Sequence, residues 1–343
     1  MAKMFPPDSI QELLFEKIIQ QHSQKSDALD NIRKLLSIGK DALYRRLRGE
    51  TGLSPDELRI LALHYNISID EVIFQNTSNA FVSYNAFEGE TQTFLEFTSN
   101  LNGMLRQVSE QSKGELLNAS DEMPIFQLMR FPKLFAFKLY VWGVNTWQFN
   151  HLQKIPFKTN LVSPEVLKIA KENVKLYESL DTIELWDLGV MEKTLNQIET
   201  CALVDQFANP KDALVLCDQL SELFQHLRKE AKAGYKFPIR KSSKRGEFHL
   251  YNNEMSSTGN TFLIKYAQTK YLVFAYCPPN FFRSHDRRLC DYTEKWFENI
   301  ITRSTAISGA GARSRNQYFN RLEKKIAKMK ERIEMIIEGE DDF

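Results

Sequence analysis

The stretch SIGKDALYRRLRG, residues 37–49, decides how the amino-terminal part of this chain is interpreted. Residues 28–36 before it and residues 40–48 within it contain no proline or glycine, so each segment predicts a short helix. Only Ser37, Ile38 and Gly39 separate the two segments, and a connection this short predicts a tight helix–helix turn. The centre of the region is therefore expected to be a helical pair.

Three capping boxes predict the starts of further helices around this pair. Ser9, Ser54 and Ser68 are each followed three residues later by a glutamate, so helices are expected to begin near residues 10, 55 and 69. Together with the central pair they make five short helices. The apolar residues that recur at helical spacing are expected to form one small core: Leu13, Leu14, Ile18, Ile32, Leu35, Leu36, Ile38, Leu43, Leu47, Leu58, Leu61, Ile67, Ile69 and Val72.

Charge is balanced over the whole chain but not within this region. The 343 residues carry 45 Lys and Arg against 44 Asp and Glu, so the overall composition gives no sign of a nucleic-acid partner. Between residues 33 and 48, however, the only acid is Asp41, and the basic residues are Arg33, Lys34, Lys40, Arg45, Arg46 and Arg48. A basic stripe on the second helix of a tight pair is what phosphate contact and groove insertion require.

The region resembles the lambda-repressor/Cro-like (XRE) helix-turn-helix family over roughly residues 10–75. The glycine that ends the second helix of the pair, Gly49, and the segment Ile67-Ser-Ile-Asp70 match that family. Arg33 departs from it, because a small residue is usual there. The resemblance implies double-stranded DNA as partner, a transcription regulator as function, and a DNA-binding set on the second helix: Lys40, Asp41, Tyr44, Arg45 and Arg48.

Residues 1–75 are thus expected to form a helix-turn-helix DNA-binding domain. The rest of the chain is expected to form a linker over residues 76–93, a helical domain over 94–235 and an α+β sensor-like or dimerisation region over 236–343. Strand-like patterns at residues 247–253, 261–267 and 271–276 predict a small antiparallel sheet. The fold class predicted is mainly α, and α+β overall. Stretches of sequence such as DEMPIFQLMRFPKLFAFKLYVW resemble those of a group of long bacterial helix-turn-helix proteins. This resemblance implies a similar domain architecture, but it identifies no ligand and no catalytic residue.

The final segment contains an apolar 3–4 repeat that allows two interpretations. Phe319, Leu322, Ile326, Met329, Ile333 and Ile336 form a heptad-like stripe, which could be the seam of a homodimer or an amphipathic helix packed on its own chain. A homodimer is expected, because one small helix-turn-helix reads only a few base pairs. The basic cluster from Lys236 to Arg245 is expected to be a solvated loop, with a supplementary phosphate contact as the alternative.

The sequence predicts no enzyme. It contains no Gly-rich phosphate loop after a strand, no nucleophile elbow and no HExxH motif, so no catalytic residues, cofactor or metal are predicted. Four scattered cysteines and the absence of a leader or an apolar span predict a cytoplasmic protein without a membrane partner; any small-molecule effector stays unknown. Two alternatives stay open: a helix-turn-helix that docks to protein, and an enzyme with a DNA-targeting head, which a cavity with converging ionisable groups would favour.

Overall fold

The structure is a computed structural model of the chain. It describes residues 9–22, 24–65, 67–73, 80, 82–85, 93–110, 114–241, 243–256, 258–267 and 269–339. The chain divides into two compact units, residues 1–82 together with 284–286, and residues 83–283 together with 287–343. Most of the predicted linker, 76–93, lies outside the described residues.

The N-terminal unit consists of the helices that the sequence predicts: α1 (Ile10–Gln20), α2 (Lys25–Leu35), α3 (Lys40–Leu47), α4 (Pro55–His64) and α5 (Ile69–Ile73). The capping boxes of α1 and α4 both form. The Ser54 hydroxyl accepts a hydrogen bond from the Glu57 N–H at 3.1 Å, and the Glu57 carboxylate accepts one from the Ser54 N–H at 2.9 Å. Two otherwise unpaired amides are thereby satisfied at the helix start, which locates α4 from purely local chemistry.

One apolar core holds these helices together. Leu14 and Ile18 of α1, Ile32 of α2, Leu43 of α3 and Val72 of α5 are all buried in it. Each of these residues belongs to the apolar set predicted from helical spacing. Phe15, Leu29 and Tyr65, which lie outside the predicted set, are buried in the same core.

The second unit is built on a mixed sheet, and the expected fold class, mainly α with a small antiparallel sheet, is wrong. The strands are β1 (Ser83–Asn85), β2 (Glu115–Ser120), β3 (Asp181–Trp186), β4 (Phe248–Asn252), β5 (Thr261–Tyr266), β6 (Thr269–Ala275), β7 (Phe281–Ser284) and β8 (Thr305–Ala306). They lie in the order β1-β7-β6-β5-β2-β3-β4-β8. β2, β3 and β4 are parallel to one another, while β2 pairs antiparallel with β5, and β5 with β6. Two central strands thus come from the segment expected to be helical.

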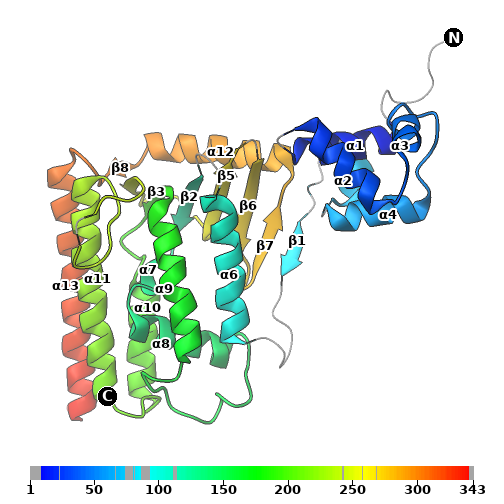
Figure 1. Ribbon diagram of the computed structural model, residues 1–343. Coiled ribbons are helices and arrows are strands. Elements are labelled where there is room, and N and C mark those ends of the chain that lie inside the picture. The colour runs from blue at the N-terminus through cyan, green and yellow to red at the C-terminus, as the bar shows by residue number, and fades with distance from the viewer. Residues whose placement is uncertain are drawn as a thin grey trace. The chain divides into compact units, whose positions relative to one another are not determined.

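Most helices of this unit cover one face of the sheet. They are α6 (Phe94–Ser109), α7 (Ile125–Leu128), α8 (Pro132–Asn145), α9 (Pro164–Ser179), α10 (Glu192–Leu203), α11 (Lys211–Ala233) and α13 (Ala312–Glu338). Figure 1 shows α6 beside α9 and α11 beside α13. The helices between β2 and β3, and between β3 and β4, supply the crossover connections that parallel strands require.

The opposite face of the sheet packs against α12 (Arg287–Thr302). Leu117, Leu185 and Leu263 point to this side and meet Cys290 and Phe297 of the helix. The preceding or following residues of the same strands, such as Leu116 and Trp186, belong to the core on the other face. Both faces are therefore buried, which is the usual condition for parallel strands.

The apolar stripe of α13 packs within its own chain. Phe319, Leu322, Ile326 and Ile333 are all buried in the main core of the second unit, where α13 runs along α11 and α10. Salt bridges such as Lys330–Asp218, at 2.7 Å, flank this seam. Of the two interpretations of the repeat, the amphipathic helix is confirmed, and α13 does not present these side chains to a second copy. None of the described helices combines the length and apolar character that a bilayer crossing requires.

Candidate nucleic-acid interface

The turn between α2 and α3 is closed by backbone hydrogen bonds. Ser37 adopts a left-handed conformation, with φ of 53°, directly after α2. Its N–H donates to the Lys34 carbonyl at 3.2 Å, and the N–H of Ile38 donates to the Arg33 carbonyl at 3.1 Å. These two bonds form a Schellman motif, which ends α2 and turns the chain into α3 within four residues.

The C-terminal end of α3 is closed by the same motif, with a glycine in the left-handed position. Gly49 has φ of 71°, and the N–H of Glu50 donates to the Arg45 carbonyl at 2.9 Å. A side chain at position 49 would be strained in this backbone region whatever the space around it. The helix that carries the predicted DNA-binding residues is thus fixed at both ends.

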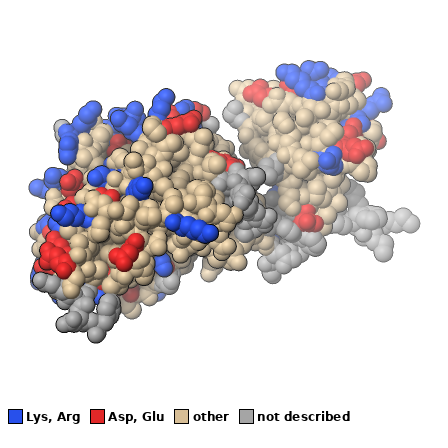
Figure 2. All heavy atoms as spheres, turned by 90° about the horizontal axis from the view of Figure 1, so that it is seen from below, with Lys and Arg blue, Asp and Glu red and all other residues tan. Residues whose placement is uncertain are grey.

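All five predicted DNA-binding residues lie on the surface of α3 or its C-terminal cap. We call this exposed set, Lys40, Asp41, Tyr44, Arg45 and Arg48, the α3 face. Leu43, on the opposite side of the helix, is buried in the core and holds the face outward. Figure 2 shows Lys and Arg side chains gathered on the surface of the N-terminal unit. The face therefore combines cations with hydrogen-bonding groups and leaves them accessible.

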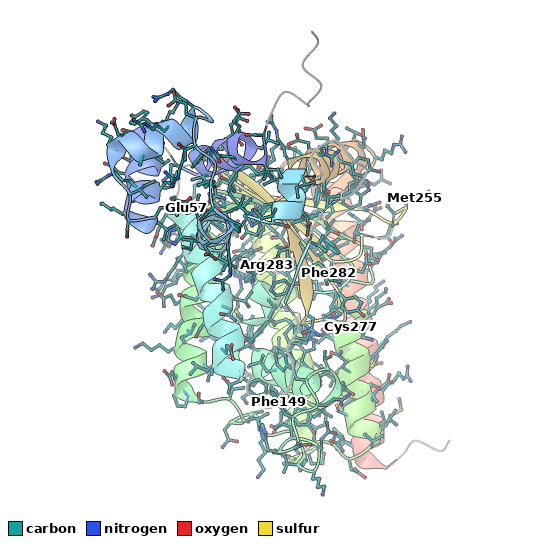
Figure 3. All side chains as sticks on the ribbon, turned by 90° about the vertical axis from the view of Figure 1, so that its right-hand side faces the viewer. Glu57, Phe149, Met255, Cys277, Phe282 and Arg283 are labelled. Atoms are coloured by element: carbon teal, nitrogen blue, oxygen red, sulfur yellow. The ribbon has the colours of Figure 1, made fainter. Side chains whose placement is uncertain are left out.

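Arg46 has a different role from its neighbour Arg45. Its guanidinium donates to the carboxylate of Glu57 on α4 at 2.8 and 3.3 Å, and the pair is largely shielded from solvent. Burial alone would raise the pKa of Glu57, but hydrogen bonds from Ser54 and Arg46 outweigh it and hold that pKa below its ordinary value. Glu57 is labelled in Figure 3. Arg46 thus fixes α3 against α4 and is not part of the α3 face.

A glutamine ties this helical pair to α1. The side-chain amide of Gln11 donates to the carbonyls of Arg46, at 2.6 Å, and Thr51, at 3.0 Å, and its oxygen accepts from the N–H of Leu53 at 2.6 Å. One side chain therefore bonds to three backbone groups, one in the last turn of α3 and two in the loop that follows it. The orientation of the α3 face is set by these contacts as well as by the core.

Arg48 is held in an exposed ion pair. Its guanidinium donates to the Glu50 carboxylate at 2.6 and 3.0 Å, and about half of each side chain is open to solvent. The hydrogen bond with Glu50 raises the pKa of Arg48 and lowers the pKa of Glu50. An exposed pair of this kind contributes little to stability, so a nucleic acid could take the place of Glu50.

The second unit buries a group of charged side chains that the sequence did not reveal. Arg130 Nη1 lies 3.0 Å from Glu230 Oε1 and 3.8 Å from Glu178 Oε1, and all three side chains are inaccessible. Burial raises the pKa of Glu230, but Arg130 and a hydrogen bond with His226 outweigh this and hold it below its ordinary value. The group joins the α7–α8 connection to α9 and α11, so its observed contacts are structural.

Lys236 extends this group toward the sheet. The expectation that residues 236–245 form a solvated loop is wrong for Lys236, which is fully buried. Its ammonium donates to Thr182 Oγ1 at 3.0 Å and to the Glu247 carbonyl at 2.8 Å. The Lys236 Nζ atom also lies 5.3 Å from the centre of the Tyr177 ring. Burial lowers the pKa of Lys236 to about 8, although the nearby Glu184 carboxylate opposes the shift. No local pattern signals this role, because the partners come from distant segments.

An enzymatic site would need ionisable groups that converge on a cavity. The second unit has a cavity between the sheet and α6, but among its lining residues only Glu122 is ionisable. Arg130, Glu230 and Lys236 are not part of that lining. Within the described ranges, no group of three or more His, Cys, Asp or Glu side chains is arranged to hold a metal ion, and the four cysteines are free thiols.

Comparisons of the chain with protein-family models, with curated proteins and with solved structures found no match.

Proposed function

We propose that the protein is a sequence-specific regulator of transcription that binds double-stranded DNA through the α3 face and acts in the cytoplasm. The observation that carries the proposal is a contrast among the basic side chains of this helix. Arg46 forms an internal ion pair with Glu57, whereas Lys40, Arg45 and Arg48 are exposed. Helix caps, core and turn all orient α3 so that these cations face solvent. The proposal assigns no catalytic step, cofactor or metal to the protein.

The chemistry of the α3 face suits the major groove. Arginine binds guanine O6 and N7 in a bidentate manner, which gives Arg45 and Arg48 base-reading roles. Lys40, in the first turn of α3, is suited to a phosphate, and Asp41 accepts from the amino group of cytosine. Tyr44, 39% exposed, offers a hydroxyl and an apolar ring edge. Arg48 would exchange its bond with Glu50 for one with the base.

A homodimer belongs to the same proposal. A single helix-turn-helix covers few base pairs, and two copies on half-sites one helical turn apart would extend the sequence that is read. The stripe of α13 is occupied within its own chain, so the pairing surface must lie elsewhere. Light scattering on the purified chain, alone and with DNA, measures this directly.

The experiment that tests the function is selection of genomic fragments by the full-length protein, followed by gel shifts on the enriched fragments. The double variant Arg45→Ala, Arg48→Ala should lose at least ten-fold in affinity for an enriched fragment. Arg59→Ala is the matched control, because Arg59 is exposed on α4 outside the α3 face. Absence of enrichment, or equal binding by the folded double variant, would favour the alternative in which the helical unit docks to protein.

A further inference from the structure

The cavity between α6 and the sheet is lined by residues of the second unit alone and is partly open to solvent. The sheet supplies its floor, where Leu116 pairs with Ile264, and Phe262 with Val273. Phe97, Leu101 and Met104 of α6 form the opposite wall, and Trp142 of α8 closes one side. Pro278 to Phe281 also line the cavity, and Figure 3 labels Cys277 and Phe282, the residues before and after them in the sequence. The space measures about 130 Å³.

The size of the space indicates what fits within it. A cavity of roughly 150 Å³ lined by Leu, Ile and Phe takes up one benzene molecule. A space of about 130 Å³ therefore matches a single ring or an aliphatic chain of similar volume. Sixteen of the twenty lining residues are apolar, so the body of the occupant must be apolar as well.

The polar lining residues gather at one end of the cavity. Ser120 is the last residue of β2, Glu122 follows it, and Asn260 directly precedes β5, which pairs antiparallel with β2. Asn280 lies near Asn260, because the N–H of Ala275, the last residue of β6, donates to the Asn260 carbonyl at 3.3 Å and the next N–H, of Tyr276, donates to the Asn280 carbonyl at 2.9 Å. The occupant is thus apolar along its body and meets hydrogen-bonding groups at one end only.

The charge at this end favours an uncharged polar group. Among the described residues that line the cavity none is Lys, Arg or His, so the lining itself offers an anion no cation. The Glu122 carboxylate is already neutralised by an ion pair with Lys138, which also donates to Gln197 at 3.1 Å. Asn260 Oδ1 accepts from the backbone amides of Asp121 and Glu122 at 3.1 and 3.2 Å, so the remaining hydrogen-bonding group of this side chain is the Nδ2 donor.

We propose that this cavity is a receptor site for a small neutral molecule: one aromatic ring, or a chain of equal volume, bearing a single hydroxyl or carbonyl that accepts a hydrogen bond from Asn260. The site is independent of DNA binding by the N-terminal unit, and its test uses no DNA. Its ligand would enter with the apolar part toward α6 and the oxygen toward Asn260.

The test uses a matched series of fluorinated rings with the full-length protein: 4-fluorophenol, 4-fluorotoluene and 4-fluorobenzoate, followed by fluorine NMR. The phenol should bind saturably and at least ten-fold more tightly than the benzoate. Ala275→Phe places a ring in the cavity and should abolish phenol binding while the protein stays folded by circular dichroism. Phe274→Leu, on the other face of the same strand, is the control and should bind phenol as the unaltered protein does.

Asn260→Asp tests the polar end. Asn260 has φ of 52°, a conformation that aspartate also tolerates, and the variant keeps the Oδ1 acceptor while it removes the Nδ2 donor. Binding of 4-fluorobenzaldehyde, whose carbonyl oxygen can only accept a hydrogen bond, should weaken several-fold, whereas toluene binding should be unchanged. Equal phenol binding by folded Ala275→Phe, benzoate binding as tight as phenol binding, or no saturable binding of any ring would overturn the proposal.

Discussion

The dependence of DNA affinity on salt tests the α3 face without knowledge of the operator. On a duplex of arbitrary sequence, each phosphate neutralised by a protein cation contributes about −0.9 to the slope of log K against log salt. Lys40, Arg45 and Arg48 are the exposed cations of the face. If each meets one phosphate, the slope per chain is about −2.7, and the affinity falls about 40-fold between about 50 and about 200 mM salt.

The perturbation is Lys40→Ala in the full-length chain. It leaves two cations on the face, so the slope should change to about −1.8 and the loss over the same salt range to about 12-fold. Because Lys40 is exposed, stability should stay within about 0.5 kcal/mol of the unaltered protein. Fluorescence anisotropy of a labelled duplex, titrated at several potassium chloride concentrations, gives the slope.

Arg59→Ala, which removes an exposed cation from α4, is the control and should keep the original slope. If the protein binds as a dimer, both slopes double and their ratio is unchanged. A Lys40→Ala slope equal to that of the unaltered protein, or an equal change for Arg59→Ala, would refute the assignment of this face.

Four further perturbations follow from the contacts described. Arg46→Ala should lower the stability of the N-terminal unit by about 1 kcal/mol through loss of the Glu57 pair, whereas Arg45→Ala should not; urea denaturation distinguishes them. Gly49→Ala should cost about 1–2 kcal/mol because of its left-handed backbone, and Gly52→Ala, with open space and ordinary φ, should be neutral in the same assay. The double variant Ile326→Glu, Ile333→Glu should unfold the second unit, as measured by circular dichroism, because both side chains are buried within the chain. A folded variant with half the mass of the unaltered protein would instead show that the stripe forms a dimer interface. The pKa of Lys236 is about 8 in the folded protein against an ordinary value of 10.5. Between these two values the unfolded chain binds one proton more than the folded chain, so the free energy of unfolding should rise with pH. Lys236→Met should abolish that rise in denaturation curves recorded between pH 8 and 10.5.

The N-terminal unit could be predicted from sequence because its signals are local. A capping box needs only two residues three positions apart, and Ser54 and Glu57 bond as the pattern predicts. The outward position of the α3 face follows from the helical period around Leu43. The roles of adjacent residues do not follow in this way. Arg45 and Arg46 are chemically identical, and only the position of Glu57 on another helix distinguishes them.

The central strands of the second unit were missed because their sequences carry polar residues at buried positions. β3 contains Thr182 and Glu184, which neither alternate like a half-exposed strand nor form an apolar run. Their burial is possible because Tyr177 donates to Glu184, and Lys236 donates to Thr182. Tyr177 precedes Glu184 by only seven residues, but Lys236 lies beyond α11, so a window of sequence around β3 contains only part of the explanation.

The sequence by itself therefore determined the helices of the N-terminal unit, their caps and the basic face of α3, since each depends on residues within a few positions of one another. Tertiary structure alone decided the mixed sheet, the cavity beneath α6 and the use of the α13 stripe. The repeat that includes Ile326 and Ile333 suits a second copy and α11 equally well, because an apolar stripe specifies burial and not its partner. Which surface covers it depends on where the rest of the chain has folded, and that information is not local.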